Sequence, residues 1–356
     1  MDTIIDLDGH VAICCGCTSS QGLSKEAKLV NTGLALNPLG AGGEFAADWP
    51  IPAYCAPTLV EMHALGSIIA KLVHDGNRVI IVGEDCGVAA SIAAAYLTKR
   101  YTPLNTIIEE LQSIGVELTV DQESIVEAYA AVLRYAGSEP LWGILRLGAW
   151  NDWGQGELHA SRVAQLAVRL WNSLAPQLGL DPSMAGLLAV AGLLHDIGRG
   201  REDPGKGHDA AGAEIVLGSS LLDKLPRKEV ETIACLIRNH RNKGDPREDP
   251  LCHNEQSVLA AALLKIADGL DYSLDQSVHD VRARISGETI TIDVMCREGL
   301  PCSINLEHAG KKAWLLERET GQRIAFTKTA CSNCRCDRYE ILPRKPSLEE
   351  LPSRLW

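Results

Sequence analysis

The first third of the chain alternates short strand-like and helix-like runs of apolar residues. Residues 78–83, RVIIVG, form a continuous apolar run rich in β-branched side chains, as expected for a buried parallel strand. Apolar positions at helical spacing precede this run in residues 58–77 and follow it in residues 88–101. A strand flanked in sequence by helices predicts an α/β domain, which we place at residues 1–137.

The pattern becomes helical in the middle of the chain and changes again near its end. Residues 138–156 are rich in Gly and Trp and are predicted to be a packed connector. Residues 157–278 carry apolar positions at helical spacing almost throughout, which predicts an all-α domain. Residues 279–356 begin with alternating apolar and polar positions, followed by a helical run and a last strand. We therefore predict a multidomain chain with an N-terminal α/β domain, a central all-α domain and a small C-terminal α+β segment.

Composition and charge narrow the partners that the chain can have. Of its 356 residues, 46% are hydrophobic, enough for a sizeable core, and the formal net charge is −12. Binding to a nucleic-acid polymer needs clustered Lys and Arg, so a small phosphorylated substrate is the better expectation. No apolar stretch reaches the roughly 18 residues of a membrane span, and the acidic N-terminus lacks the basic region of a secretory signal. We expect a cytoplasmic protein without membrane contact and leave open whether it is a homodimer.

The twelve cysteines fall into two kinds. Cys86, Cys235 and Cys296 stand in apolar runs and are predicted to be small buried hydrophobic residues. Two clusters are closely spaced, which in a cytosolic chain indicates metal or redox chemistry more than a disulfide framework. A bound metal, an Fe–S cluster, reduced surface thiols, and disulfides in a hyperthermophile all remain open. The clusters are Cys14, Cys15 and Cys17, and Cys331, Cys334 and Cys336.

A set of His and Asp side chains carries the chemistry that the sequence indicates most strongly. A His or Asp at the end of an apolar helix costs solvation energy unless it is paired or binds a metal. Imidazole and carboxylate ligands together suit borderline divalent ions, and the helices of one bundle can supply them from several segments. We predict one or two divalent ions, with Mn, Fe, Ni, Co, Zn and Mg as candidates, that activate water for attack on a phosphate. The predicted metal ligands are His159, His195, Asp196, His208, His240 and Asp268.

The order H…HD…H…H…D resembles the HD superfamily of metal-dependent phosphohydrolases. Within it, residues 157–326 are most similar to the C-terminal region of the exopolyphosphatase/guanosine pentaphosphate phosphohydrolase family, through AGLLHDIG, ETIACLIRNHR, LLKIADGLDYS and the strand–strand–helix–strand tail. In that family, phosphate hydrolysis is attributed to a separate actin-like domain, whose phosphate-loop strands are not visible in this sequence. The resemblance therefore implies the helical fold and the metal-ligand pattern, and does not imply the polyphosphate activity.

Basic residues beside the predicted ligands indicate a bound phosphate. Arg199 follows the HD pair, Lys206 precedes the third ligand histidine and Arg241 follows the fourth, a local reversal of charge in an acidic chain. An Arg guanidinium is a planar fork that fits phosphate oxygens. A solvated charged loop is the alternative. The residues assigned to catalysis are His195, Asp196 (also as proton acceptor for the attacking water), Arg199, Lys206 and Arg241.

Residues 49–135 resemble the cysteine-dependent protein tyrosine and dual-specificity phosphatases. WPIPAYCAPTLVEM is similar to the loop of the general acid, RVIIVGEDCGVAASIAAAYL to the strand, phosphate loop and helix, and DQESIVEAY to the closing helix with Gln122 in the family's place. That family needs a Cys thiolate at a helix N-terminus and, after five intervening residues, an Arg on the phosphate.

The residues that would perform this phosphatase chemistry are replaced. Alignment on AAYL puts Val82 at the Cys position and Val88 at the Arg position. Taking Cys86 as the nucleophile puts Ile92 at the Arg position, so neither register works. The resemblance therefore implies a pseudophosphatase: a scaffold, a regulatory or dimerisation module, or a binder of something other than phosphate. The general-acid and phosphate-loop positions are also altered, to Ala53, Glu84 and Asp85.

The sequence thus predicts a metal-dependent phosphohydrolase that cleaves a phosphoester or phosphoanhydride of a nucleotide-like small molecule by metal-activated water. The alternative is a non-catalytic, nucleotide- or phosphate-sensing regulatory protein with a pseudophosphatase module, because an inactive first domain lowers the expectation of activity in its neighbour. A weaker third hypothesis gives the Cys clusters an Fe–S centre with a redox role.

Overall fold

The computed structural model describes residues 3–16, 27–32, 45–201, 207–241, 244–297 and 300–331. They form two compact units: unit 1 holds the described residues up to Ala130, and unit 2 holds those from Ala131 onward. The predictions for residues outside this part of the chain stay predictions. These residues are Cys17, Lys206, Cys334 and Cys336, together with the side chain of Cys331.

A five-stranded sheet forms the centre of unit 1, with the strand order β1-β2-β5-β3-β4. β5 (Arg78–Gly83) lies in the middle and pairs in parallel with β2 (Val11–Cys15) and β3 (Ala27–Asn31). β4 (Phe45–Asp48) pairs in parallel with β3, and β1 (Thr3–Asp6) is antiparallel at the opposite edge. Every residue of β5 after the first is buried, which confirms the predicted buried parallel strand.

Helices pack on this sheet because the contact removes apolar side chains of both from water. α1 begins at a capping box, in which Thr58 and Glu61 each bond the other's backbone N–H. α2 is rich in Ala, is almost entirely buried, and packs against β2, β5 and α1. The described helices that begin in unit 1 are α1 (Leu59–His74), α2 (Cys86–Lys99), α3 (Leu104–Ser113) and α4 (Val120–Ala136), which continues into unit 2.

A helix occupies most of the stretch that was predicted to be a connector. α5 spans Ser138–Trp150. Its two interior glycines, part of the Gly-rich composition that predicted a connector, allow close packing. A Cβ at Gly143 would lie 2.0 Å from the carbonyl oxygen of Leu221, and a Cβ at Gly148 would meet the ring of Trp153.

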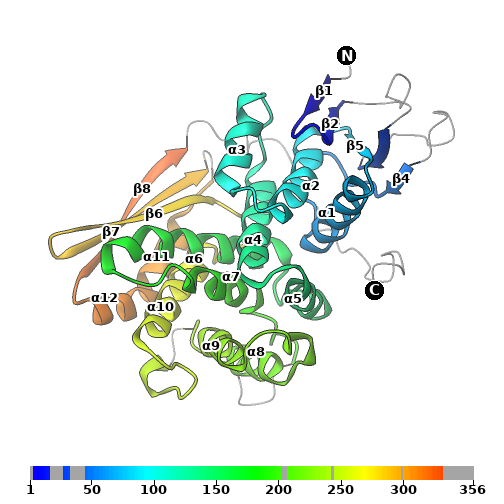
Figure 1. Ribbon diagram of the computed structural model, residues 1–356. Helices are drawn as coiled ribbons and strands as arrows, with labels where there is room; N and C mark the ends of the chain where they lie inside the picture. The colour runs from blue at the N-terminus through cyan, green and yellow to red at the C-terminus, as the bar shows by residue number, and fades with distance from the viewer. Residues whose placement is uncertain are drawn as a thin grey trace. The chain divides into compact units, whose positions relative to one another are not determined.

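A helical bundle makes up most of unit 2 and is the region drawn in green to yellow in Figure 1. α6 packs against α7 and α10, and α9 packs against α7, α8 and α10. Apolar residues from these helices fill the core, and the fully buried Trp171 is among its largest side chains. The bundle helices are α6 (Glu157–Leu178), α7 (Met184–Leu194), α8 (His208–Gly218), α9 (Arg227–Arg238) and α10 (Glu255–Leu270), with short 3₁₀ turns at Ser220–Leu222 and Pro246–Glu248.

The end of unit 2 forms the predicted α+β segment. Its three-stranded sheet has the order β6-β7-β8, with β6 antiparallel and β8 parallel to β7. The parallel pair requires a crossover, which two helices provide where one had been predicted. α11 packs along α10, and β6 packs along α6. The elements are β6 (Val278–Ser286), β7 (Thr289–Arg297), α11 (Ser303–Lys312), α12 (Trp314–Thr320) and β8 (Arg323–Cys331).

Disulfides correct the prediction for the cysteines in apolar runs. All three of these cysteines are bonded to a partner, with Cα–Cα distances of 4.9, 5.3 and 6.3 Å, within the range that a disulfide spans. Cys14 is also disulfide-bonded, so Cys14 and Cys15 offer no thiolate to a metal or an Fe–S cluster. The pairs are Cys15–Cys86 in unit 1, and Cys235–Cys252 and Cys296–Cys302 in unit 2.

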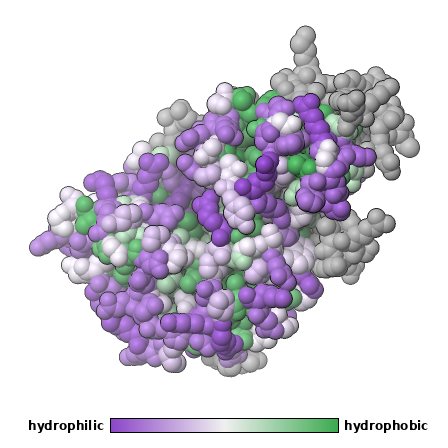
Figure 2. All heavy atoms as spheres, viewed as in Figure 1, coloured by the Kyte–Doolittle hydropathy of each residue, from purple (hydrophilic) through white to green (hydrophobic). Residues whose placement is uncertain are grey.

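The visible surface is mainly hydrophilic, with apolar residues gathered in small separate areas (Figure 2). Among the helices that the structure describes, none combines the length and the hydropathy needed to cross a bilayer.

Candidate metal centre

The predicted metal ligands come together at one end of the bundle helices in unit 2. His159 lies in the first turn of α6, His195 and Asp196 directly follow α7, and Asp268 lies in the last turn of α10. His208 is the first residue of α8, and His240 follows the end of α9 by two residues. Five segments that are distant in sequence thus contribute to one cluster, in which the four histidines and Asp196 are buried and Asp268 is partly buried.

The first group of ligand atoms surrounds one point between α6, α7 and α10. Nε2 of His159 lies 3.7 Å from Oδ1 of Asp268 and 3.9 Å from Oδ2 of Asp196. Nε2 of His195 lies 3.7 Å from the same Asp268 oxygen and 3.6 Å from the same Asp196 oxygen. Of these residues, His159, His195 and Asp268 offer ligand atoms close enough to one another to hold one divalent ion.

The second group uses the other oxygen of the same carboxylate. Oδ1 of Asp196 lies 3.2 Å from Nε2 of His208 and 3.6 Å from Nε2 of His240. The two imidazole nitrogens are 3.3 Å apart. Asp196 is therefore shared between both groups, one oxygen facing each, as a bridging carboxylate of a dinuclear site would be.

Hydrogen bonds at the opposite ring nitrogen orient three of the four histidines. Nδ1 of His195 donates to the carbonyl of Gly192 at 2.7 Å, and Nδ1 of His240 donates to the carbonyl of Ile237 at 2.6 Å. Nδ1 of His159 donates to Oδ2 of the buried Asp271 at 2.8 Å. A proton fixed on Nδ1 leaves the Nε2 lone pair for a metal, which is the usual arrangement at metal-binding histidines.

Two of these Nε2 atoms fit a metal better than any other partner. Nε2 of His159 and Nε2 of His195 are buried and have no hydrogen-bond partner among the described residues. An unsatisfied buried ring nitrogen costs free energy, and each of these faces two carboxylate oxygens across a gap too long for a hydrogen bond. A divalent ion between them would satisfy both nitrogens, so the residues fit the ion.

The electrostatics keep the ligand carboxylates ionised. Burial alone raises the pKa of Asp268, but Lys312 and His195 outweigh it and hold this pKa well below its usual range. Burial also raises the pKa of Asp196, but the interactions with His195, His208 and His240 are stronger, so the pKa of Asp196 is lowered as well. The pKa of His195 is raised because the two carboxylates outweigh its burial. A metal ion would therefore compete with a proton at His195 and not at the carboxylates.

Two contacts at the predicted ligand carboxylates, and one at a predicted ligand histidine, were not anticipated from the sequence. Nζ of Lys312, from α11, pairs with Oδ2 of Asp268. Nε2 of Gln155, from the turn before α6, donates to Oδ2 of Asp196 at 2.7 Å. Asp271 had been passed over for its neighbour three residues earlier, although the sequence LLKIADGLDYS offers both aspartates at one end of an apolar helix. The spacing of the two aspartates in the sequence does not show that Asp271 contacts His159; the structure does.

The predicted phosphate contacts are placed in part. Nε of Arg199 donates to Oδ2 of Asp196 at 2.8 Å, so this guanidinium lies at the first ligand group. Nη1 of Arg241 lies 3.3 Å from Oδ1 of Asp209, in the first turn of α8. Lys206 lies outside the described residues.

Two glycines allow the backbone to close around Asp196. A Cβ at Gly198 would lie 2.1 Å from the carbonyl oxygen of His208, so only Gly lets the turn after α7 approach α8. Gly154 has φ +78°, and a Cβ there would lie 2.0 Å from the carbonyl oxygen of Asp196. The position of the bridging carboxylate thus depends on close backbone contacts as well as on its own hydrogen bonds.

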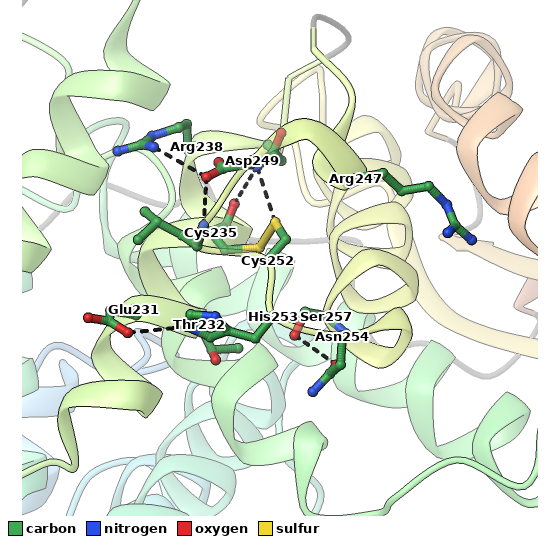
Figure 3. Close-up of a disulfide and its surroundings, with 12 residues drawn as sticks. Glu231, Thr232, Cys235, Arg238, Arg247, Asp249, Cys252, His253, Asn254 and Ser257 are labelled. Atoms are coloured by element: carbon green, nitrogen blue, oxygen red, sulfur yellow. Dashed lines mark hydrogen bonds and ion pairs between the residues drawn. A yellow bond between two sulfur atoms is a disulfide. The ribbon is translucent and has the colours of Figure 1, made fainter.

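A disulfide ties the end of α9 to the segment that precedes α10 (Figure 3). Cys235 of α9 bonds to Cys252, and Asp249 accepts from Arg238 at 3.3 Å and from Nδ2 of Asn239 at 2.8 Å. Asn239 directly precedes His240, so these bonds fix the backbone from which that ligand projects.

In unit 1, the loop between β5 and α2, which was compared with a phosphate loop on the basis of its sequence, places a carboxylate of the chain itself at the start of α2. Two residues, Glu84 and Asp85, connect β5 to α2. The Asp85 side chain accepts from the backbone N–H groups of Gly87 and Val88 at 3.2 and 3.3 Å, and from Nε2 of Gln122 at 3.2 Å. A helix N-terminus is an anion site, and here Asp85 occupies it.

Comparison with known proteins agrees with this geometry in unit 2. Residues 157–273, about a third of the chain, match the family model described as HD domain. No curated protein matches the chain. The match begins where α6 begins and includes all six predicted ligands. Unit 2 therefore carries a domain of the HD superfamily, which consists of metal-dependent phosphohydrolases that bind divalent metals.

Proposed function

We propose that the protein is a metal-dependent phosphohydrolase that cleaves a phosphoester or phosphoanhydride of a nucleotide-like small molecule. The observation that carries this proposal is the sharing of Asp196 between two groups of inward-facing ligand atoms. These two groups of residues would hold two divalent ions, which would supply charge stabilisation to the attacking and the leaving oxygen of a phosphate displacement. A single structural ion would need only one of the two groups.

The chain's own residues supply position and charge. The Nδ1 hydrogen bonds of His159, His195 and His240 fix the rings before any ligand arrives, which lowers the entropy cost of assembling the site. Lys312 and Arg199 place positive charge beside the ligand carboxylates. We propose Arg199, Arg241 and Lys206 as contacts of the substrate phosphate. The lowered pKa of Asp196 disfavours the role of proton acceptor that the sequence suggested for it.

Two observations in unit 1 favour a non-catalytic role for this unit. Asp85 takes the backbone N–H groups that a bound phosphate would need. Cys86 is consumed in a disulfide with Cys15, so it offers no thiolate nucleophile. We propose that unit 1 is a pseudophosphatase module and that phosphate chemistry is confined to unit 2.

Metal content tests the site, with a control that the chain itself offers. The test variant is His195→Ala/Asp196→Ala. The matched control is His74→Ala/Asp75→Ala, the same dipeptide at the exposed end of α1. We expect about two metal equivalents in the wild type and the control, and none in the test variant. Equal metal content in all three proteins would contradict the assignment of the ligands.

Turnover tests the reaction. Protein loaded with Mn, Co or Ni is assayed for phosphate release on a panel of nucleotides and small phosphoesters. Release that is lost in the His195→Ala/Asp196→Ala variant supports the hydrolase. Two bound metals with tight nucleotide binding and no release on any substrate would instead select the sensing role, which the inactive unit 1 favours.

A further inference from the structure

A stacked pair of aromatic rings lies one turn beyond the ligand carboxylate Asp268. The rings of Tyr272 and His308 are 3.4 Å apart at their centroids, with an angle of 10° between their planes. Tyr272 is 50% exposed, although His308 covers one face of its ring. Half of the Tyr272 side chain is thus open to solvent, four residues after the predicted metal ligand Asp268.

The helix pair α10–α11 connects this stacked pair of rings to the metal centre. Lys312 pairs with Asp268, and four residues away on each segment His308 stacks on Tyr272. Residues four apart on a helix share a face, so Lys312 and His308 lie on one side of α11. Between the two pairs the backbones touch, because a Cβ at Gly269 would lie 2.7 Å from the Cα of Ala309.

The turn that carries Tyr272 is held in place by a buried side chain. Oδ1 of Asn305 accepts from the backbone N–H of Ser273 at 2.9 Å, and its Nδ2 donates to Oγ of Ser277 at 2.7 Å. Asn305 is fully buried. The ring of Tyr272 is therefore presented by a fixed backbone, which reduces the entropy that a ligand would have to remove.

The side chains along this side of α11 change from cationic to aromatic to apolar, and the first two would suit the phosphate and the base of a nucleotide. Lys312, next to the metal ligands, is cationic, then comes the aromatic pair, and one turn further Ile304 is apolar and 44% exposed. A nucleotide with its phosphate at the metal centre would have Lys312 at its phosphate end, and its base would extend along α11 toward the aromatic pair. Base stacking on an aromatic side chain is a common and sequence-tolerant mode of recognition.

We infer that Tyr272, supported by His308, is the platform for the base of a mononucleotide whose phosphate is held at the metal centre. This inference rests on the proposed function and adds the part of the substrate that the metal centre does not contact. A polymer is disfavoured as the occupant because the chain carries a net charge of −12.

The test compares two probes that differ only in the base. AMP and ribose 5-phosphate are titrated into the metal-loaded full chain by calorimetry, with KM in place of Kd wherever a probe is turned over. We expect the wild type to bind AMP about ten-fold more tightly than ribose 5-phosphate, the lower part of the range measured for stacking. Tyr272→Leu should weaken AMP to the level of ribose 5-phosphate, while Tyr272→Phe, which keeps the ring, should retain the preference.

The control and the outcomes separate this inference from the proposed function. Tyr101→Leu removes an exposed tyrosine of unit 1 and should leave both affinities unchanged. Equal affinity of the wild type for the two probes, or an equal loss of both in Tyr272→Leu, would overturn the base platform and leave the metal centre intact. Failure of both probes to bind the wild type would contradict the proposed function and this inference together.

Discussion

Replacing the Cys235–Cys252 bridge by Cys235→Ala/Cys252→Ala should destabilise unit 2 by a predictable amount. The two cysteines are 17 residues apart in sequence. Closing a loop of this length in the unfolded chain is worth about 3 kcal/mol in the chain-entropy model. Ala is the appropriate replacement because Cys235 is fully buried, and a Ser hydroxyl at this position would have no water to bond.

The assay is thermal unfolding followed by tryptophan fluorescence, together with a count of alkylated thiols by mass spectrometry. For a unit of this size, each kcal/mol shifts the Tm by about 2–4 °C, so the expected decrease is roughly 6–12 °C. Cys55→Ala is the matched control, because Cys55 is outside the disulfides of the described residues. The control should unfold within about 2 °C of the wild type, since it removes no cross-link.

The loop-length reasoning can also be tested against a second bridge. Cys296 and Cys302 are only 6 residues apart, for which the same model gives about 2 kcal/mol. Their double Ala variant should therefore lose less stability than the first. If the Cys235–Cys252 variant keeps the wild-type Tm, or if the shorter loop proves the more costly, the account of these bridges as constraints on the unfolded chain is refuted.

Three further predictions concern the metal centre and the surface. Asp271→Asn should weaken metal binding about 10–100-fold, whereas Asp275→Asn, at an exposed aspartate, should not, as isothermal titration with Mn would show. Gly198→Ala should reduce the bound metal to about one equivalent, measured by elemental analysis, because its Cβ would push α8 away from the shared carboxylate. The hydrogen bond from Arg318 lowers the pKa of Asp245 to about 2, below the 3.8 of the unfolded chain. Its stabilisation is therefore complete above about pH 4 and lost as the pH falls toward 2. Tm measured across that range should fall less steeply in Asp245→Asn, and an unchanged slope would contradict the pairing.

The sequence could indicate which side chains gather in this cluster because their chemistry conflicts with their surroundings. His195 and Asp196 follow one of the most apolar helices, where only pairing or a metal makes them tolerable. Asp271 could not be assigned in the same way. It lies three residues from Asp268, both lie at one helix end, and only the fold shows which carboxylate faces the metal groups and which accepts from His159.

The elements that the sequence did not reveal depend on contacts between distant segments. α5 was not predicted because its segment is rich in Gly, whereas the missing Cβ of Gly143 and Gly148 accommodates the backbone of Leu221 and the ring of Trp153. The disulfides were equally hidden, since the partner of Cys235 follows no spacing rule. By contrast, β5 was predictable because a run buried on both faces needs no partner to be recognised.

The carboxylate at the start of α2 has a consequence for the binding of dissolved anions to unit 1. A dissolved anion that sought this helix end would compete with Asp85, which is part of the chain and so is present at an effective concentration that dilution cannot lower. At this helix end, phosphate mimics such as vanadate or tungstate would meet a competitor that never diffuses away. If the proposed phosphohydrolase activity is inhibited by such oxyanions, we therefore expect the inhibition to arise at the candidate metal centre of unit 2 and not at this helix end.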